Sequence, residues 1–283
     1  MQTDLLRAID VLVTRPTHQA QELCALFEQA GARVTCFPVI AIEAVQLTQK
    51  VLDVIVDIDK IDFAVFISPN AVTYGIAQLV AHGKIPATLK LVTIGKASAD
   101  KLYSLLGKMP DIYPREQYHS EALLALESMQ KEYLQHKQVL IFRGCGGREF
   151  LAQSLRQRGA KVSYAEVYQR LRPEPEDDVL DVVFNLRLPD IITLTSNEGL
   201  NNLVSMLKHA KSENKLVYLN NLWRIPLLVV TEKMRDNARS LGFTNTVVIA
   251  DKASNNALLE GVVHWSTKYF NNQFGSLNSR ENF

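Results

Sequence analysis

The chain has 283 residues, enough for two domains of ordinary size, and its 47% hydrophobic and 22% charged content is typical of a globular protein. Its 31 basic and 30 acidic side chains leave a formal charge of +1, which argues against a protein that coats nucleic acid or a membrane. Three cysteines without metal-like spacing indicate a reducing compartment. Because no signal-peptide pattern or long apolar run is present, we expect a cytoplasmic protein.

An internal repeat organises the chain. Residues 11–15 (VLVTR) match residues 139–143 (VLIFR), and 143 − 15 gives an offset of 128. The same offset carries residues 62–68 (DFAVFIS) onto residues 190–196 (DIITLTS), and further on an offset of 135 relates Gly107 to Gly242. We therefore expect two copies of one structural unit, with the chemistry in the cleft between them.

The first copy opens with a compact apolar strand over residues 11–13. An apolar stripe at helical spacing follows, formed by Leu23, Leu26, Phe27 and Ala30. Gly31 is expected to end this helix, and residue 34 begins the next strand. The same pattern recurs in the second copy, where residue 159 is the matching glycine. The nearly continuous apolar strands 63–67 and 191–195 predict parallel, doubly wound sheets with helices on both faces.

Two segments between these elements, residues 37–42 and 167–173, occupy equivalent places in the repeat. Their composition suits a pair of extended linkers. The Asn-, Ser- and Gln-rich residues at the end of the chain predict a disordered tail over 269–283.

No common catalytic motif is present. The sequence lacks a phosphate-binding loop, a dinucleotide fingerprint, a zinc-protease motif and a nucleophile elbow. The six histidines are scattered, and metal or catalytic use would need convergent partners. No local motif therefore indicates cofactor chemistry.

Polar residues at strand ends remain as candidates, because open α/β sheets bind ligands there. The segment 143–148 (RGCGGR) joins a strand to a helix; it is either an anion-binding loop or a tight turn with surface arginines. The pairs at 68–70 and 195–197 are either helix caps or ligand contacts. The candidate binding residues at these ends are Arg15, Ser68, Asn70, Lys96, Ser98, Arg143, Gly144, Arg148, Thr195, Ser196 and Thr231.

Tyr168 lies in the second linker segment, where the first copy has Ile40. Its side chain either packs or presents its hydroxyl to the cleft as a proton donor. We take it as the candidate catalytic residue.

Several of these segments together resemble the uroporphyrinogen-III synthase family. They are residues 11–16 (VLVTRP), 66–72 (FISPNAV), 94–98 (IGKAS), 139–144 (VLIFRG), 167–170 (VYQR) and 194–196 (LTS). The resemblance runs in order over roughly residues 10–265. It implies two similar parallel-sheet α/β domains joined by a two-stranded linker, one domain being discontinuous. The expected boundaries are 1–38 with 172–268 for one domain and 39–171 for the other. The repeat alone would predict two continuous halves.

The resemblance implies a cyclising lyase of tetrapyrrole (haem and sirohaem) biosynthesis that needs no cofactor. Its substrate would be the linear tetrapyrrole hydroxymethylbilane, closed to uroporphyrinogen III with loss of water and inversion of ring D. Transient contact with the deaminase that produces this substrate would fit, and we expect a monomer without nucleic-acid or membrane partners. The sequence departs from the family pattern at Ser98, where threonine is usual, and at Thr231 and Met234, where glycine and threonine are expected.

Two other classes of function stay open from the residues alone. Two α/β lobes with a hinge are also how binding proteins close on a small polyanionic ligand without chemistry. A nucleotide-using transferase is the second alternative, weakened by the missing phosphate-binding loop.

Overall fold

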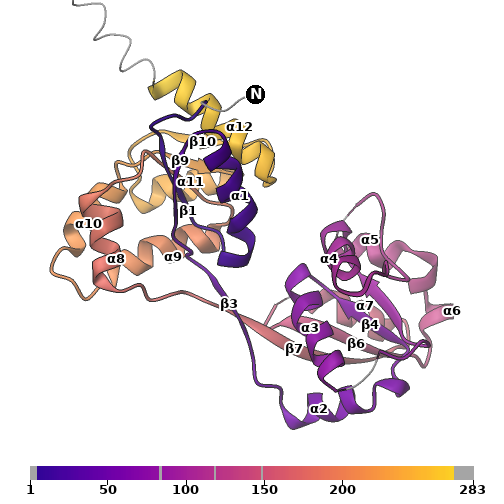
Figure 1. The fold of residues 1–283 in the computed structure, drawn as a ribbon. Helices are drawn as coiled ribbons and strands as arrows, with labels where there is room; N and C mark the ends of the chain where they lie inside the picture. The colour runs from indigo at the N-terminus through magenta and orange to yellow at the C-terminus, as the bar shows by residue number, and fades with distance from the viewer. Residues whose placement is uncertain (1–4, 83–84, 118, 148, 271–283) are drawn as a thin grey trace, which may run out of the picture. The chain divides into compact units, whose positions relative to one another are not determined.

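The computed structural model describes residues 5–82, 85–117, 119–147 and 149–270. The chain separates into two compact units: unit 1 contains residues 1–41 and 171–283, and unit 2 contains residues 42–170. The chain passes between them along strands β3 (Ala41–Ala44) and β7 (Lys161–Leu171) (Figure 1). Among the described residues, no helix combines the length and apolar character needed to cross a membrane.

Unit 1 is built around a parallel five-stranded sheet in the order β10-β9-β8-β1-β2. Its strands are β1 (Asp10–Val13), β2 (Arg33–Cys36), β8 (Ile191–Thr193), β9 (Leu227–Val229) and β10 (Val247–Ile249). Its helical segments are α1 (Thr17–Gln29), α8 (Asp177–Asp181), η3 (Val182–Leu186), α9 (Asn197–Lys208), α10 (Lys215–Leu222), α11 (Glu232–Leu241), α12 (Asn255–Trp265) and η4 (Ser266–Phe270). Helices α1 and α12 pack against one face of this sheet in a shared apolar cluster.

Unit 2 has a five-stranded sheet in the order β3-β7-β6-β4-β5, in which the β7-β6-β4-β5 pairs are parallel. The strands besides β3 and β7 are β4 (Phe63–Phe66), β5 (Lys90–Thr93) and β6 (Gln138–Gly144). The helical segments are α2 (Gln49–Val56), η1 (Ile58–Lys60), α3 (Pro69–Ala81), α4 (Lys96–Leu106), α5 (Ser120–Ala125), η2 (Glu127–Met129), α6 (Lys131–Leu134) and α7 (Phe150–Gln157).

Helices cover both faces of the sheet in unit 2, as its continuously apolar strands predicted. Alternate residues of β4 and β6 enter two different apolar clusters, because successive side chains of a strand point to opposite faces. Phe66 and Phe142 pack with α2, α3 and α4, whereas Val65 and Ile141 pack with α5, α6 and α7. We call these the α3 face and the α7 face.

The strand register confirms the repeat. Val11 pairs with Val34 on one side and with Ile191 on the other. At an offset of 128, Val139 pairs with Val162 and with Phe63. Each unit therefore combines β-strands from both copies of the repeat, and the two continuous halves that the repeat alone would predict do not form.

The glycine expected to end the first helix has the predicted conformation. Gly31 has φ +92° after α1, and its repeat partner Gly159 has φ +87° after α7. This left-handed conformation is the one in which a glycine closes a helix at least steric cost.

Two expectations can be made more precise. The second linker segment is extended, as expected, and its residues 167–171 are the end of the 11-residue strand β7, at which the chain passes from one unit to the other. Of the tail predicted to be disordered, residues 269 and 270 belong to η4 instead. The remainder of that tail lies outside the described residues.

Candidate functional site

The carboxyl edge of the sheet in unit 2 places two of the predicted site residues in contact. Ser68 follows β4 and caps α3, accepting a hydrogen bond from the Ala71 N–H at 3.0 Å. The Tyr168 hydroxyl lies 3.1 Å from the same Ser68 Oγ. Tyr168 is only 4% exposed and Ser68 is half-buried, so a phenol and an alcohol form a part-buried pair at the positive end of a 13-residue helix.

Tyr168 comes from the last part of β7, and its ring contacts two neighbours. Gly144 at the end of β6 lies against it: a Cβ built at Gly144 would be 2.8 Å from Tyr168 Cε2 and Cζ. Tyr74 stacks with it at a centroid distance of 5.9 Å, and the Tyr74 hydroxyl donates to the Ile42 carbonyl at 2.9 Å. The side chain therefore packs, which is one of the two roles that the sequence left open, and its use as a proton donor stays a prediction.

A β-bulge gives Tyr168 this orientation. Arg143 pairs with Glu166, but the next residue, Gly144, pairs with Tyr168 and skips Val167. Both Val167 and Tyr168 are consequently buried in the cluster on the α3 face, whereas consecutive residues of a regular strand face opposite sides.

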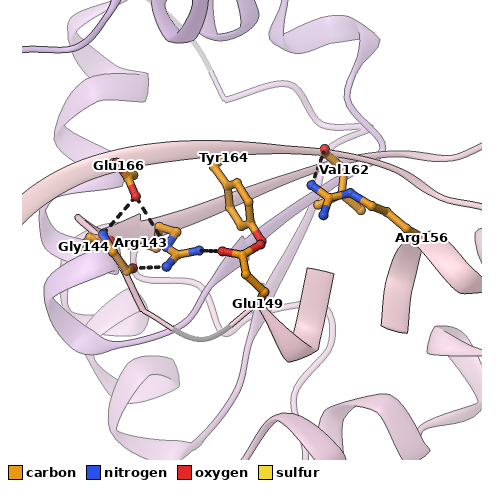
Figure 2. A network of polar contacts seen from close by, with 8 residues as sticks. Arg143, Gly144, Glu149, Arg156, Val162, Tyr164 and Glu166 are labelled. Carbon is orange, nitrogen blue, oxygen red and sulfur yellow. Dashed lines mark hydrogen bonds and ion pairs between the residues drawn. The ribbon is translucent and has the colours of Figure 1, made fainter. Parts of the chain in front are cut away.

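Arg143 is almost completely buried, with 2% of its surface exposed. Its Nη1 donates to Glu149 Oε1 at 2.9 Å, its Nη2 to the Gly146 carbonyl and its Nε to the Gly144 carbonyl at 3.3 Å. The guanidinium carbon also lies 4.6 Å from the Tyr164 ring centroid. Figure 2 shows this network around the end of β6.

The charges of this network shift the ionisation of two groups. The Tyr164 hydroxyl donates to Glu149 Oε2 at 2.5 Å. This hydrogen bond, with that from Arg143, lowers the pKa of Glu149. Burial, and then the bond to the Glu149 carboxylate, raises the pKa of Tyr164. Both groups therefore keep their ordinary charge states at neutral pH: an ionised carboxylate and a neutral phenol.

The other candidates of unit 2 lie at the starts of α3 and α4. Asn70 is buried in the first turn of α3, and Ser98 is buried in the first turn of α4. Lys96 is exposed and its Nζ donates to Asp100 at 2.6 Å, one turn further along α4. Arg148 lies outside the described residues.

The candidates of unit 1 lie at the equivalent edge of their own sheet. Ser196 caps α9 by accepting from the Gly199 N–H at 3.0 Å, and Thr231 caps α11 by accepting from the Met234 N–H at 3.2 Å. Thr195, half-buried, precedes the first of these caps.

Arg15, at the end of β1, is turned toward the start of α12. Its Nη2 donates to the Ala253 carbonyl at 2.5 Å, and its Nη1 donates to the Asn255 side chain. Burial lowers the pKa of Arg15, although nearby Glu22 opposes this.

A cavity of about 590 Å³ opens on the α7 face of unit 2. It is lined in part by Ile67, Ile94, Ile141, Arg143, Phe150 and Tyr164. The Tyr168 ring belongs to the α3 face, so this cavity and the Tyr168–Ser68 pair lie on opposite sides of the sheet.

The structure thus brings Tyr168, Ser68 and Gly144 together, and it surrounds Arg143 with residues that sequence reasoning missed. These are Glu149, Tyr164 and Glu166. None belongs to a motif. Comparison of the two copies of the repeat could have indicated them. At an offset of 128 the first copy has Gln21, Cys36 and Pro38, so only the second copy has two carboxylates and a phenol at these positions.

Comparisons with known proteins agree with the resemblance of the motifs. The family model described as uroporphyrinogen-III synthase HemD matches residues 21–260. Uroporphyrinogen-III synthase of Salmonella typhimurium is 32% identical over 256 residues, covering 90% of this chain and 100% of the relative. The Escherichia coli protein of the same name is 30% identical over 255 residues, with 90% and 100% coverage.

Two solved structures share the fold. A mutant uroporphyrinogen III synthase from Thermus thermophilus superposes with a TM-score of 0.54 at 18% identity, covering 92% of this chain and 100% of that one. Uroporphyrinogen-III synthetase from Helicobacter pylori gives a TM-score of 0.54 at 14% identity, covering 90% and 99%. With the family model matching most of the sequence, the chain belongs to the uroporphyrinogen-III synthase family.

Proposed function

We propose that this chain closes hydroxymethylbilane to uroporphyrinogen III, with Tyr168 as the proton donor for the departing hydroxyl. Family membership supports the reaction. The observation that carries the role of Tyr168 is the position of its hydroxyl, 3.1 Å from Ser68 Oγ at the start of α3, in a residue that is 4% exposed.

The first step breaks the bond between the terminal carbon of ring A and its hydroxyl. Tyr168 gives its proton to that hydroxyl, water leaves, and the substrate becomes an azafulvene cation. The phenolate left behind accepts the Ser68 hydroxyl hydrogen and faces the positive end of α3, both of which stabilise its charge.

The remaining steps rearrange the carbon skeleton. The substituted carbon of ring D attacks the azafulvene to form a spiro intermediate, which reopens and closes again with ring D inverted. Loss of a proton restores the aromatic pyrrole, and this proton returns to the Tyr168 phenolate. Atoms balance as one substrate giving one product and one water. The protein's main task is to hold one folded geometry of a flexible chain.

Each pyrrole of the substrate carries an acetate and a propionate, so anion-binding groups are needed. Helix N-termini supply partial positive charge and backbone N–H groups for carboxylates. In unit 2, α3 and α4 begin at the sheet edge beside Ser68 and Lys96; in unit 1, α9 and α11 begin at Ser196 and Thr231. We assign substrate carboxylates to these helix starts.

The test is to give the purified protein fresh hydroxymethylbilane and to separate the oxidised product isomers by chromatography. We expect isomer III to predominate over the spontaneous isomer I. Tyr168→Phe should lower turnover on the order of 10²-fold or more while keeping the fold, because its ring still packs against Gly144 and Tyr74. Tyr133→Phe, at a half-exposed tyrosine on α6, is the matched control.

Two results would contradict the proposal. Isomer I alone from folded protein would favour the non-catalytic binding protein. Undiminished turnover by Tyr168→Phe, with isomer III still formed, would remove Tyr168 from the chemistry and leave the activity in place.

A further inference from the structure

The buried guanidinium of Arg143 is engaged within its own unit. Nη1, Nη2 and Nε each donate to a neighbouring oxygen, and Nε also lies 3.8 Å from Glu166 Oε1. The side chain is 3% exposed and stacks on the Tyr164 ring (Figure 2). An arginine with several charged and carbonyl partners already in place is poorly suited to form a new fork on a substrate carboxylate.

What Arg143 holds instead is the loop that follows it. Gly146 and Gly147 have φ +72° and +107°, so the backbone turns around the guanidinium in a conformation that favours glycine. A Cβ at Gly147 would lie 2.8 Å from Arg143 Nη2. The Gly146 N–H donates to Glu166 Oε1 at 3.1 Å, so Glu166 ties the same loop to β7.

This loop touches Tyr168 at two points. The Cys145 N–H donates to the Tyr168 carbonyl at 2.8 Å, which closes the bulge between β6 and β7. Gly144 lies against the Tyr168 ring, where even a Cβ would come within 3.1 Å of the hydroxyl oxygen. The position of Tyr168 therefore depends on the path of residues 144–146, and that path is fixed by Arg143 and Glu166.

We infer that Arg143 is a positioning residue, which acts through the 144–147 loop and the β-bulge to hold the Tyr168 hydroxyl against Ser68. The inference rests on the proposed role of Tyr168 as proton donor. It differs from the sequence-based expectation that Arg143 binds substrate directly. Loss of a positioning residue should lower kcat and disturb Tyr168 in the free protein, whereas loss of a substrate ligand should raise KM and leave Tyr168 in place.

The first measurement needs no substrate. The protein is labelled with 3-fluorotyrosine, and the ¹⁹F resonance of Tyr168 is assigned by its loss in Tyr168→Phe. We expect Arg143→Gln to move or broaden this resonance. Because removing Arg143 leaves two carboxylates without their partner, Glu166→Ala is the second variant; Glu166 is 45% exposed and its loss frees the Gly146 N–H. Arg156→Gln is the control, since Arg156 lies near the same Tyr164 ring but bonds only to the Val162 carbonyl at 3.3 Å among the contacts drawn in Figure 2.

The second measurement is steady-state turnover of hydroxymethylbilane. We expect Arg143→Gln and Glu166→Ala to lower kcat by about 10-fold to 100-fold with KM nearly unchanged, because a misplaced donor slows the chemical step and leaves binding intact. On a Tyr168→Phe background, Arg143→Gln should have little further effect, since both changes disable one group.

An unmoved Tyr168 resonance in both variants would overturn the inference. So would a raised KM with unchanged kcat, or losses that multiply with Tyr168→Phe, because each would make Arg143 a substrate ligand. If the protein forms no isomer III at all, the proposed function fails, whereas the ¹⁹F measurement still decides whether Arg143 positions Tyr168.

Discussion

Arg15 and Arg143 end equivalent strands of the two units, yet their surroundings differ. Arg15 is half-buried and bonds to Asn255 and to a backbone carbonyl near the start of α12. Arg143 is buried among two carboxylates and an aromatic ring. Similarly, Ser68 and Ser196 cap equivalent helices, but Ser68 contacts a tyrosine hydroxyl, whereas in unit 1 Ile40 stands at the position equivalent to Tyr168. One scaffold thus supports an edge with a buried arginine and a tyrosine–serine contact in unit 2, and a simpler capped edge in unit 1.

The largest expected effect comes from giving Gly144 a side chain. Gly144→Ala places a methyl 2.8 Å from two Tyr168 ring atoms, so the ring must move. We expect turnover to fall on the order of 10²-fold and the free energy of unfolding to fall by about 1–3 kcal/mol. Product chromatography and urea unfolding followed by circular dichroism measure the two effects.

The control for this change is the equivalent position in unit 1, Pro16, which already carries a Cβ. Pro16→Ala should leave turnover within about 2-fold, because no tyrosine lies at the matching place. Full activity of Gly144→Ala would show that Tyr168 tolerates displacement.

A second comparison concerns core packing. In unit 2, Phe66 and Phe142 stack at 4.7 Å, and Gly75 on α3 makes room for them, since its Cβ would lie 2.6 Å from Phe142 Cδ1. At the equivalent positions of unit 1, the two residues at the strand ends are smaller, Leu194 for Phe66 and Thr14 for Phe142. The helix residue is larger, Leu203 for Gly75. We expect Gly75→Ala to lower the free energy of unfolding by about 1–3 kcal/mol despite its better helix propensity.

Urea unfolding checks this prediction, and Phe142→Leu on the Gly75→Ala background should recover part of the loss if the clash is its cause. Leu203→Ala, in contrast, should cost about 2–5 kcal/mol by leaving a cavity. An increase in stability for Gly75→Ala would show that α3 can shift away from the sheet.

The two capping serines separate stability from activity. Ser68→Ala and Ser196→Ala each remove an acceptor from a helix start, and each should lower the free energy of unfolding by about 1 kcal/mol. Ser68→Ala should also slow turnover by about 10-fold, because a phenolate at Tyr168 loses its hydrogen-bond donor. Equal activity of the Ser68→Ala variant and the unmodified chain would contradict a role for this pair in proton transfer.

The smallest expected effect concerns Asp62 and Asp190, which accept from equivalent backbone N–H groups at 2.8 Å. Burial opposes ionisation of both. At Asp62 the bonds from Lys137 and Gln138 outweigh burial and lower the pKa. At Asp190 burial prevails, helped by the nearby Asp10 carboxylate, and raises the pKa.

Opposite pKa shifts predict opposite pH dependence. The Asp62 carboxylate stabilises the fold above its unfolded pKa of about 3.9, and this is lost as pH falls through its lower folded pKa. The Asp190 carboxylate becomes a cost as pH rises through its raised folded pKa. At pH 7, Asp62→Asn should therefore lose about 1 kcal/mol or less after solvent screening, whereas Asp190→Asn should be neutral or stabilising. Urea midpoints of both variants at pH 7 and pH 3.5 test this, and equal losses at pH 7 would refute the distinction.

Local sequence was enough to predict most elements and the polar residues at their ends. Continuous apolar strands, the helical stripe of α1 and the glycine after it follow from side-chain periodicity and backbone sterics, which act over a few residues. Capping was one of the two roles that the sequence offered for Ser68 and Ser196, and the structure confirms it; capping could be predicted because it needs only the residue three positions on. The repeat and the family motifs likewise depend on sequence order alone.

The repeat alone did not decide which copies combine into one sheet; the family resemblance implied a discontinuous domain, and the tertiary structure shows which strands pair. Residues 63–66 and 191–193 are both apolar strands, and either could pair with β1, so the local pattern does not determine which one does. The course of the connecting segments determines the pairing. The same holds at the site. Tyr168 reaches Ser68 through a bulge of one residue, and Arg143 acquires its carboxylates from positions 6 and 23 residues further along. A one-residue shift in strand pairing changes the face a side chain enters, and nothing in the local sequence marks that shift.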